Sequence, residues 1–99
     1  MQKHMKDDIA PSEKLAKKLP VLRNHVLQAL QDYFVHLDGQ APVNLYELVI
    51  TELEVPMLEM ALNYVGGNQS KAAQILGLSR GTLRKKLERY KLTHKTKRR

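Results

Sequence analysis

The segment 44–65 constrains the fold more than any other part of the chain, because apolar residues fall on nearly every face of the helix that it predicts. One side of this helix would carry Leu45, Leu48, Val49, Leu53, Met57, Met60, Ala61 and Tyr64, and the other sides Tyr46, Ile50, Val55, Leu58, Leu62 and Val65. A helix that is apolar all round must be covered all round, and a 99-residue chain offers too little surface to do this alone. We therefore expect a second copy of the chain to supply the cover.

An amphipathic helix of about 17 residues precedes that segment, starting at Pro20. Its apolar stripe, at steps of three and four, is formed by Leu22, Val26, Ala29, Leu30, Tyr33, Phe34 and Leu37. Asp38-Gly39 supplies the turn, and Asn44 with Glu47 three residues later predicts a capping box for the next helix. The predicted fold class is all-α, with four helices per chain and an intertwined homodimer that has a four-helix core.

Charge divides the chain into three parts that point to different surroundings. Residues 1–19 have a formal charge of +2, residues 20–65 of −5 and residues 66–99 of +10, which together give the net charge of +7. A strongly basic segment that follows an acidic one favours a polyanionic partner for the basic end.

The basic end contains the sequence signals of a helix-turn-helix. Asn68 can cap a first helix, Gly77 can take the left-handed conformation that ends it, and Ser79 can cap a second helix. We expect the inner face of the first helix to consist of Ala72, Ala73, Ile75 and Leu76. Small alanines would let the second helix cross the first closely.

The second helix has the pattern of a DNA recognition helix. Leu83, Leu87 and Tyr90 share one face and should pack on the core. The opposite surface carries Arg80, Gly81, Arg84, Lys85 and Glu88, flanked by Thr82, Lys86 and Arg89. Residues near the start of such a helix reach base edges in the major groove while basic flanks meet phosphates, so the predicted partner is double-stranded DNA.

These motifs resemble the Fis family of bacterial nucleoid proteins over residues 22–90. The densest likeness lies in Leu45-Tyr46-Glu47-Leu48-Val49, in Gly67-Asn68-Gln69 and in the run from Arg80 to Leu87. The C-terminal run alone is also similar to the DNA-binding domains of NtrC-type activators. The length of the chain and its long-helix region favour Fis.

The resemblance implies a homodimeric transcriptional regulator of the bacterial cytoplasm and nucleoid that bends DNA and reads its shape. It implies a guanine contact for Arg80 and a base-proximal position for Lys85. The predicted DNA-binding residues are Asn68, Ser70, Ser79, Arg80, Thr82, Arg84, Lys85, Lys86 and Arg89. RNA polymerase and a site-specific recombinase are further partners that the family suggests.

The expected organisation is a flexible N-terminal arm (1–19), dimerisation helices (20–65), a helix-turn-helix (66–91) and a basic tail (92–99) that adds phosphate contacts. We expect no signal peptide and no membrane segment. Scattered histidines and the absence of cysteine predict no metal site and no cofactor, and nothing predicts an enzyme. The alternative function is a protein-interaction adapter or an RNA-binding helical dimer.

Overall fold

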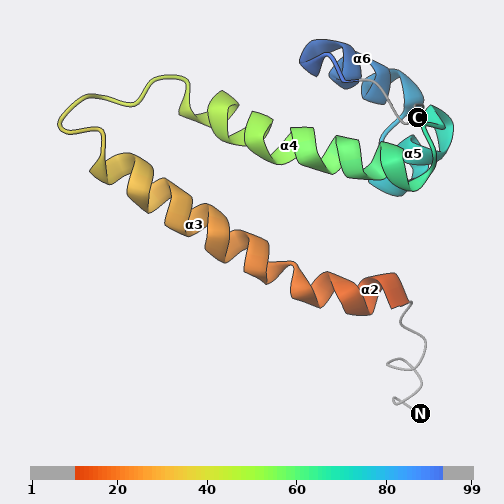
Figure 1. Ribbon diagram of the computed structural model, residues 1–99, viewed down its shortest axis with the longest axis horizontal. Helices are drawn as coiled ribbons and strands as arrows, with labels where there is room; N and C mark the ends of the chain where they lie inside the picture. The colour runs from red at the N-terminus through yellow and green to blue at the C-terminus, as the bar shows by residue number, and fades with distance from the viewer. Residues whose placement is uncertain (1–10, 93–99) are drawn as a thin grey trace. The chain divides into compact units, whose positions relative to one another are not determined.

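The computed structural model describes the backbone of residues 11–92 and the side chains of residues 13–92. In this part of the chain all regular structure is helical, which confirms the all-α fold class. The elements are α2 (Pro11–Leu15), the 3-10 helix η1 (Ala16–Lys18), α3 (Pro20–Val35), α4 (Leu45–Tyr64), α5 (Gln69–Leu76) and α6 (Arg80–Tyr90) (Figure 1). The expected four main helices are thus α3 to α6, and two short helical pieces precede them.

The chain divides into two compact units, Met1–Val43 and Asn44–Arg99. This division falls inside the segment 20–65, so that α4 belongs to the same unit as the helix-turn-helix. No helix in the described range 11–92 has both the length and the apolar character needed to cross a bilayer.

Part of the expected N-terminal arm, residues 1–19, is helical. Residues 11–18 form α2 and η1, which lead into α3, while residues 1–10 lie outside the described part. Glu13 in the first turn of α2 favours a helix start through the helix dipole. Leu15 and Leu19 also extend the apolar stripe of α3 backward from Leu22 at steps of four and three.

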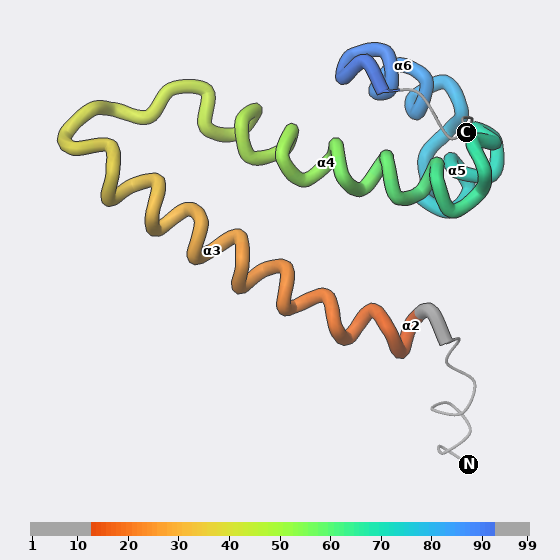
Figure 2. Tube along the Cα trace, viewed as in Figure 1, coloured from red at the N-terminus to blue at the C-terminus, as the bar shows by residue number. Residues whose placement is uncertain are grey.

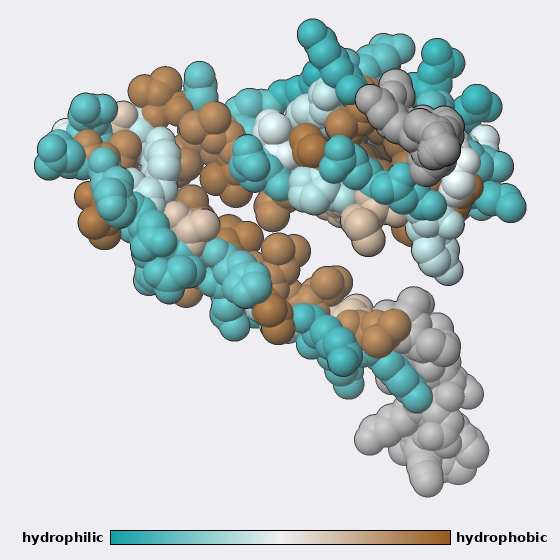
Figure 3. Space-filling model, in the orientation of Figure 1, coloured by the Kyte–Doolittle hydropathy of each residue, from teal (hydrophilic) through white to brown (hydrophobic). Residues whose placement is uncertain are grey.

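Helix α3 buries none of its own residues within the described chain. Leu22 is 50% exposed, Leu27 54% and Val35 74%, and Figure 3 shows apolar side chains along this helix. Apolar surface of this extent is unusual for a lone chain, and it agrees with the expectation that α3 packs against something else.

The second unit contains the hydrophobic core, where α4 meets the two short helices. Its buried residues are Leu58, Ala61, Leu62, Ala72, Ala73, Leu83 and Leu87, and Val65, Leu76, Tyr90 and Leu92 pack partly buried against them. The alanines of α5 are fully or almost fully buried, at 0% and 4% exposure, and thus lie on the inner face of this helix as expected.

The start of α4 differs from the expected capping box. Asn44 adopts a left-handed conformation with φ of 56°, and its side chain makes no capping hydrogen bond. A capping side chain normally belongs to a residue with extended φ and ψ, from which it reaches the second or third N–H of the helix. Glu47, the other half of the expected box, instead forms an ion pair with Arg89 of α6.

Helices α4, α5 and α6 all end in the same way. Each helix is followed by a residue with a left-handed backbone, which is Gly66, Gly77 or Lys91. The backbone N–H of the next residue then donates to the carbonyl oxygen five positions earlier. These backbone bonds are Gly67 to Leu62 at 2.8 Å, Leu78 to Ala73 at 2.9 Å and Leu92 to Leu87 at 2.8 Å. Figure 2 follows the two turns that result, from α4 into α5 and from α5 into α6.

Candidate nucleic-acid interface

The start of α5 is fixed by Asn68, as the sequence predicts. The Asn68 Oδ1 atom accepts a hydrogen bond from the Lys71 backbone N–H at 3.0 Å. Its side-chain amide N–H groups keep their capacity to donate to another acceptor. Ser70, in the first turn of α5, is exposed beside it.

Ser79 caps α6 and is linked to Thr82 twice. The Ser79 hydroxyl accepts from the Thr82 backbone N–H at 3.1 Å and donates to the Thr82 hydroxyl oxygen at 2.9 Å. Because Ser79 uses its proton on Thr82, the hydroxyl proton of Thr82 remains available to donate outward. The structure therefore places Ser79 in the cap and leaves Thr82 as the better donor to an external oxygen.

The turn between the two helices is formed by Gly77, Leu78 and Ser79. Gly77 has a φ of 76°, a conformation that residues with a Cβ rarely adopt, and Leu78 is half-buried. The predicted inner face of α5 needs one correction. Ile75 is 51% exposed. The buried Ala72 and Ala73 and the half-buried Leu76 define the side of α5 that faces the core, and Ile75 lies off that side.

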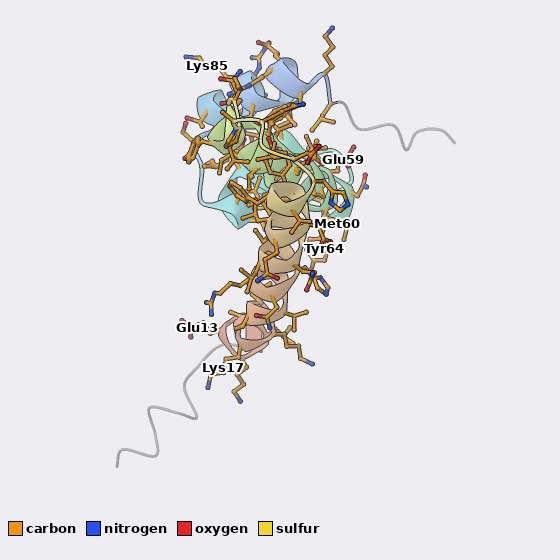
Figure 4. The ribbon with its side chains drawn as sticks, turned by 90° about the vertical axis from the view of Figure 1, so that its left-hand side faces the viewer. Glu13, Lys17, Glu59, Met60, Tyr64 and Lys85 are labelled. Carbon is orange, nitrogen blue, oxygen red and sulfur yellow. The ribbon has the colours of Figure 1, made fainter. Side chains whose placement is uncertain are left out.

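The outer face of α6 carries cations next to a glycine. Arg80, Gly81, Arg84 and Lys85 are all exposed, and Figure 4 shows Lys85 at the outer surface of α6. Nothing lies within 4 Å of the position that a Cβ on Gly81 would occupy, so this part of the face is open.

Lys86 and Arg89, two further predicted DNA-binding residues, have carboxylate partners on α4. The Lys86 Nζ atom lies 2.8 Å from Glu54 Oε2, and both side chains are largely covered, at 28% and 21% exposure. Arg89 pairs with Glu47, and there both side chains are about half exposed. The Arg89 guanidinium also lies 5.4 Å from the centre of the Tyr90 ring.

The Glu54 carboxylate is the centre of the contact between α4 and α6. Its second oxygen accepts a hydrogen bond from the Tyr90 hydroxyl at 2.6 Å. The hydrogen bonds from Lys86 and Tyr90 hold the pKa of Glu54 below its usual value, against a smaller effect of burial. The same contact with Glu54 raises the pKa of Lys86.

The sequence analysis did not predict this role of Glu54. The signal for its role was its register, since Leu58, Ala61 and Leu62 follow it at four, seven and eight residues on the buried side of α4. A carboxylate in line with core residues needs a partner, and the following helices are basic. The structure records no group of three or more metal-ligating side chains among the residues it describes.

Two capped helices joined by a three-residue turn, with a cationic outer face on the second, define a helix-turn-helix protein. The sequence profile "Bacterial regulatory protein, Fis family" matches residues 49–90, and the profile "DNA-binding protein Fis N-terminal domain" matches residues 3–42. The chain is 56% identical over 69 residues to DNA-binding protein Fis of Actinobacillus succinogenes, with 70% of each chain covered. It is 55% identical over 69 residues to the protein of that name from Proteus mirabilis, again with 70% of each covered. The chain belongs to the Fis family.

Proposed function

We propose that this protein is a homodimeric, nucleoid-associated transcriptional regulator that binds and bends double-stranded DNA. The observation that carries the proposal is the outer face of α6, where Arg80, Arg84 and Lys85 are exposed around the bare backbone of Gly81. An exposed helix of this kind fits the major groove of B-DNA, and the relatives named above are DNA-binding proteins.

Arg80 and Lys85 are the proposed contacts to base edges. Arg80 is the first residue of α6, where a guanidinium can reach guanine O6 and N7 in a bidentate manner. Gly81 offers no side chain to read a base, so few base contacts are expected. Selection of sites then depends mainly on the shape and flexibility of the DNA.

The proposed contacts to the DNA backbone surround the start of each short helix. The N-terminal N–H groups of α5 and α6 favour anions, and Asn68, Ser70 and Thr82 keep polar atoms free beside them. Arg84 adds an exposed charge. Arg89 also belongs to this set. Its ion pair with Glu47 is about half exposed and therefore weak, so a phosphate can take the place of Glu47. Ser79 acts through its cap.

A second copy of the chain is the proposed cover for α3 and for the exposed side of α4. On α4, Tyr46, Met60 and Tyr64 are 78%, 69% and 84% exposed, and Figure 4 labels two of them. Hydrophobic surfaces on two helices of one chain are typical of an intertwined homodimer. Two recognition helices on one dimer would contact successive turns of the major groove, and bending brings these turns within reach.

The salt dependence of duplex binding tests the DNA function. A dimer that neutralises about 8 to 12 phosphates should lose affinity with a log-log slope of about −7 to −11. Fluorescence anisotropy with a labelled duplex over a range of potassium chloride measures this slope. A slope near zero, or a preference for single-stranded RNA, would favour an adapter or an RNA-binding dimer instead.

Substitution on α3 tests the dimer. Leu22→Glu places a charge in the apolar stripe and should shift the mass in sedimentation from about 23 kDa, twice the 11.4 kDa of the chain, toward the monomer. Gln31→Glu adds the same charge on the opposite side of the same helix and should leave the mass unchanged. Equal effects of the two variants would contradict the proposed face.

RNA polymerase and a site-specific recombinase remain family-based proposals. The loop proposed for the polymerase contact is the one between α4 and α5. It contains Gly66, which has a left-handed backbone with φ of 64°. The basic tail (92–99) lies outside the described residues apart from Leu92, which packs partly buried against the core. A pull-down of each purified partner by the DNA-bound dimer tests these two contacts.

A further inference from the structure

Lys86 differs from the exposed cations Arg80, Arg84 and Lys85 of α6 because its ammonium contacts α4. Its ammonium donates a hydrogen bond to one carboxylate oxygen of Glu54 on α4. The hydroxyl of Tyr90, in the next turn of α6, donates to the other oxygen of the same carboxylate. One carboxylate of α4 therefore holds two consecutive turns of α6.

This contact is better shielded than the other ion pair between the two helices. Lys86 and Glu54 are about a quarter exposed, whereas Arg89 and Glu47 are about half exposed. Removing Lys86 from Glu54 would leave a largely covered carboxylate that has lost its cation, which is costly. A phosphate would therefore compete poorly for Lys86.

We propose that Glu54 is a positioning residue, which fixes the rotation of α6 on α4 through Lys86 and Tyr90, and that Lys86 makes no phosphate contact. This inference rests on the proposed DNA function. It separates Lys86, which faces inward, from the outward cations Arg80, Arg84 and Lys85. Arg89 is intermediate, because its ion pair with Glu47 is half exposed. Because α4 also carries the proposed dimer surface, the Glu54 contact would set how the two recognition helices of a dimer are presented to DNA.

Removal of single charges separates the two roles. Arg84→Met removes an outward cation and should make the log-log salt slope for duplex binding shallower by about 1.8 per dimer, at about 0.9 for each phosphate lost. Lys86→Met removes an inward cation and should leave that slope unchanged, even where affinity falls. A slope change for Lys86→Met as large as that for Arg84→Met would overturn the inference. If the unsubstituted protein shows no salt-dependent duplex binding, the proposed function fails, and the next experiment still decides the positioning role.

Amide hydrogen exchange without DNA tests the positioning. Glu54→Gln keeps the shape of the side chain but removes its charge, and Tyr90→Phe removes one hydroxyl. Each should accelerate exchange in α6 about three- to tenfold and leave α5 unchanged, because the contact holds α6 alone. Unchanged exchange in α6, or equal acceleration in α4, α5 and α6, would overturn the positioning role, since a merely structural residue lowers protection throughout the unit.

Discussion

Tyr90, the last residue of α6, donates its hydroxyl proton to Glu54 of α4 across 2.6 Å. The two residues are 36 positions apart in the chain, and Lys86 donates to the other oxygen of the same carboxylate. The recognition helix is thus attached to the longest helix of the unit by apolar packing and by two ionised carboxylates, of which Glu54 is more shielded than Glu47. The Glu54 contact therefore makes the stability of this unit dependent on pH.

The pH dependence follows from the direction of the Glu54 shift. Folding lowers the pKa of Glu54, so its contribution to stability is complete above the pKa of the unfolded chain and is lost as the pH falls through the folded value. Folding raises the pKa of Lys86, so its contribution is lost only at strongly alkaline pH. Urea unfolding at pH 7 and at acidic pH should show a loss of stability that Glu54→Gln reduces.

At pH 7, Glu54→Gln should itself cost about 1 kcal/mol, because a charged hydrogen bond in a partly exposed site is worth less than a buried one. Glu52→Gln, at an exposed position of the same helix, is the matched control and should leave the stability at pH 7 unchanged. Parallel acid profiles for the unsubstituted protein and Glu54→Gln would contradict the assignment.

Packing of the helix-turn-helix predicts a second result. Leu83 of α6 is fully buried in the core that α6 forms with α4 and α5. Leu83→Ala should therefore lower the free energy of unfolding by about 2 to 5 kcal/mol. Ile75→Ala removes a similar side chain from a position that is 51% exposed and should cost less than about 1 kcal/mol. Chemical denaturation followed by circular dichroism measures both. Equal costs would show that Ile75 is covered in solution.

Two glycines should respond to alanine in opposite directions. Gly77 has a φ of 76°, and Gly77→Ala should cost about 1 to 2 kcal/mol through backbone strain alone, since space for the methyl group is open. Gly81 lies in the first turn of α6 with nothing near its Cβ position, so Gly81→Ala should stabilise by up to about 1 kcal/mol. Thermal unfolding compares the two. A stabilising Gly77→Ala would contradict the left-handed turn.

Local signals allowed most of the helix-turn-helix to be predicted. The caps at Asn68 and Ser79 and the turn at Gly77 depend on hydrogen bonds that span three to five residues. The buried face of Leu83, Leu87 and Tyr90 follows from helical spacing. Features of this kind are set within one turn of the chain, and for that reason their sequence pattern is readable.

The features that were missed depend on contacts between distant residues. Glu47 was assigned to a cap at Asn44, but Arg89 of α6 is its partner and the Asn44 backbone is left-handed. The Lys86 ammonium donates to Glu54, 32 positions earlier, a contact that the sequence analysis did not predict. Helical spacing says which face a side chain occupies, but not which later helix will lie against that face.

The division of roles within α6 gives the sharpest prediction for DNA recognition. Arg80→Ala should weaken binding by about 1 to 3 kcal/mol at half-sites that contain the contacted guanine, and much less where another base replaces it. Arg84→Ala should weaken binding to both kinds of site equally, because a phosphate contact carries no sequence information. Competition binding with paired duplexes that differ only at that guanine measures the contrast. If Arg80→Ala lost the same affinity on both duplexes, Arg80 would be a backbone contact, and sequence preference would then have to come from Lys85 or from the shape of the DNA alone.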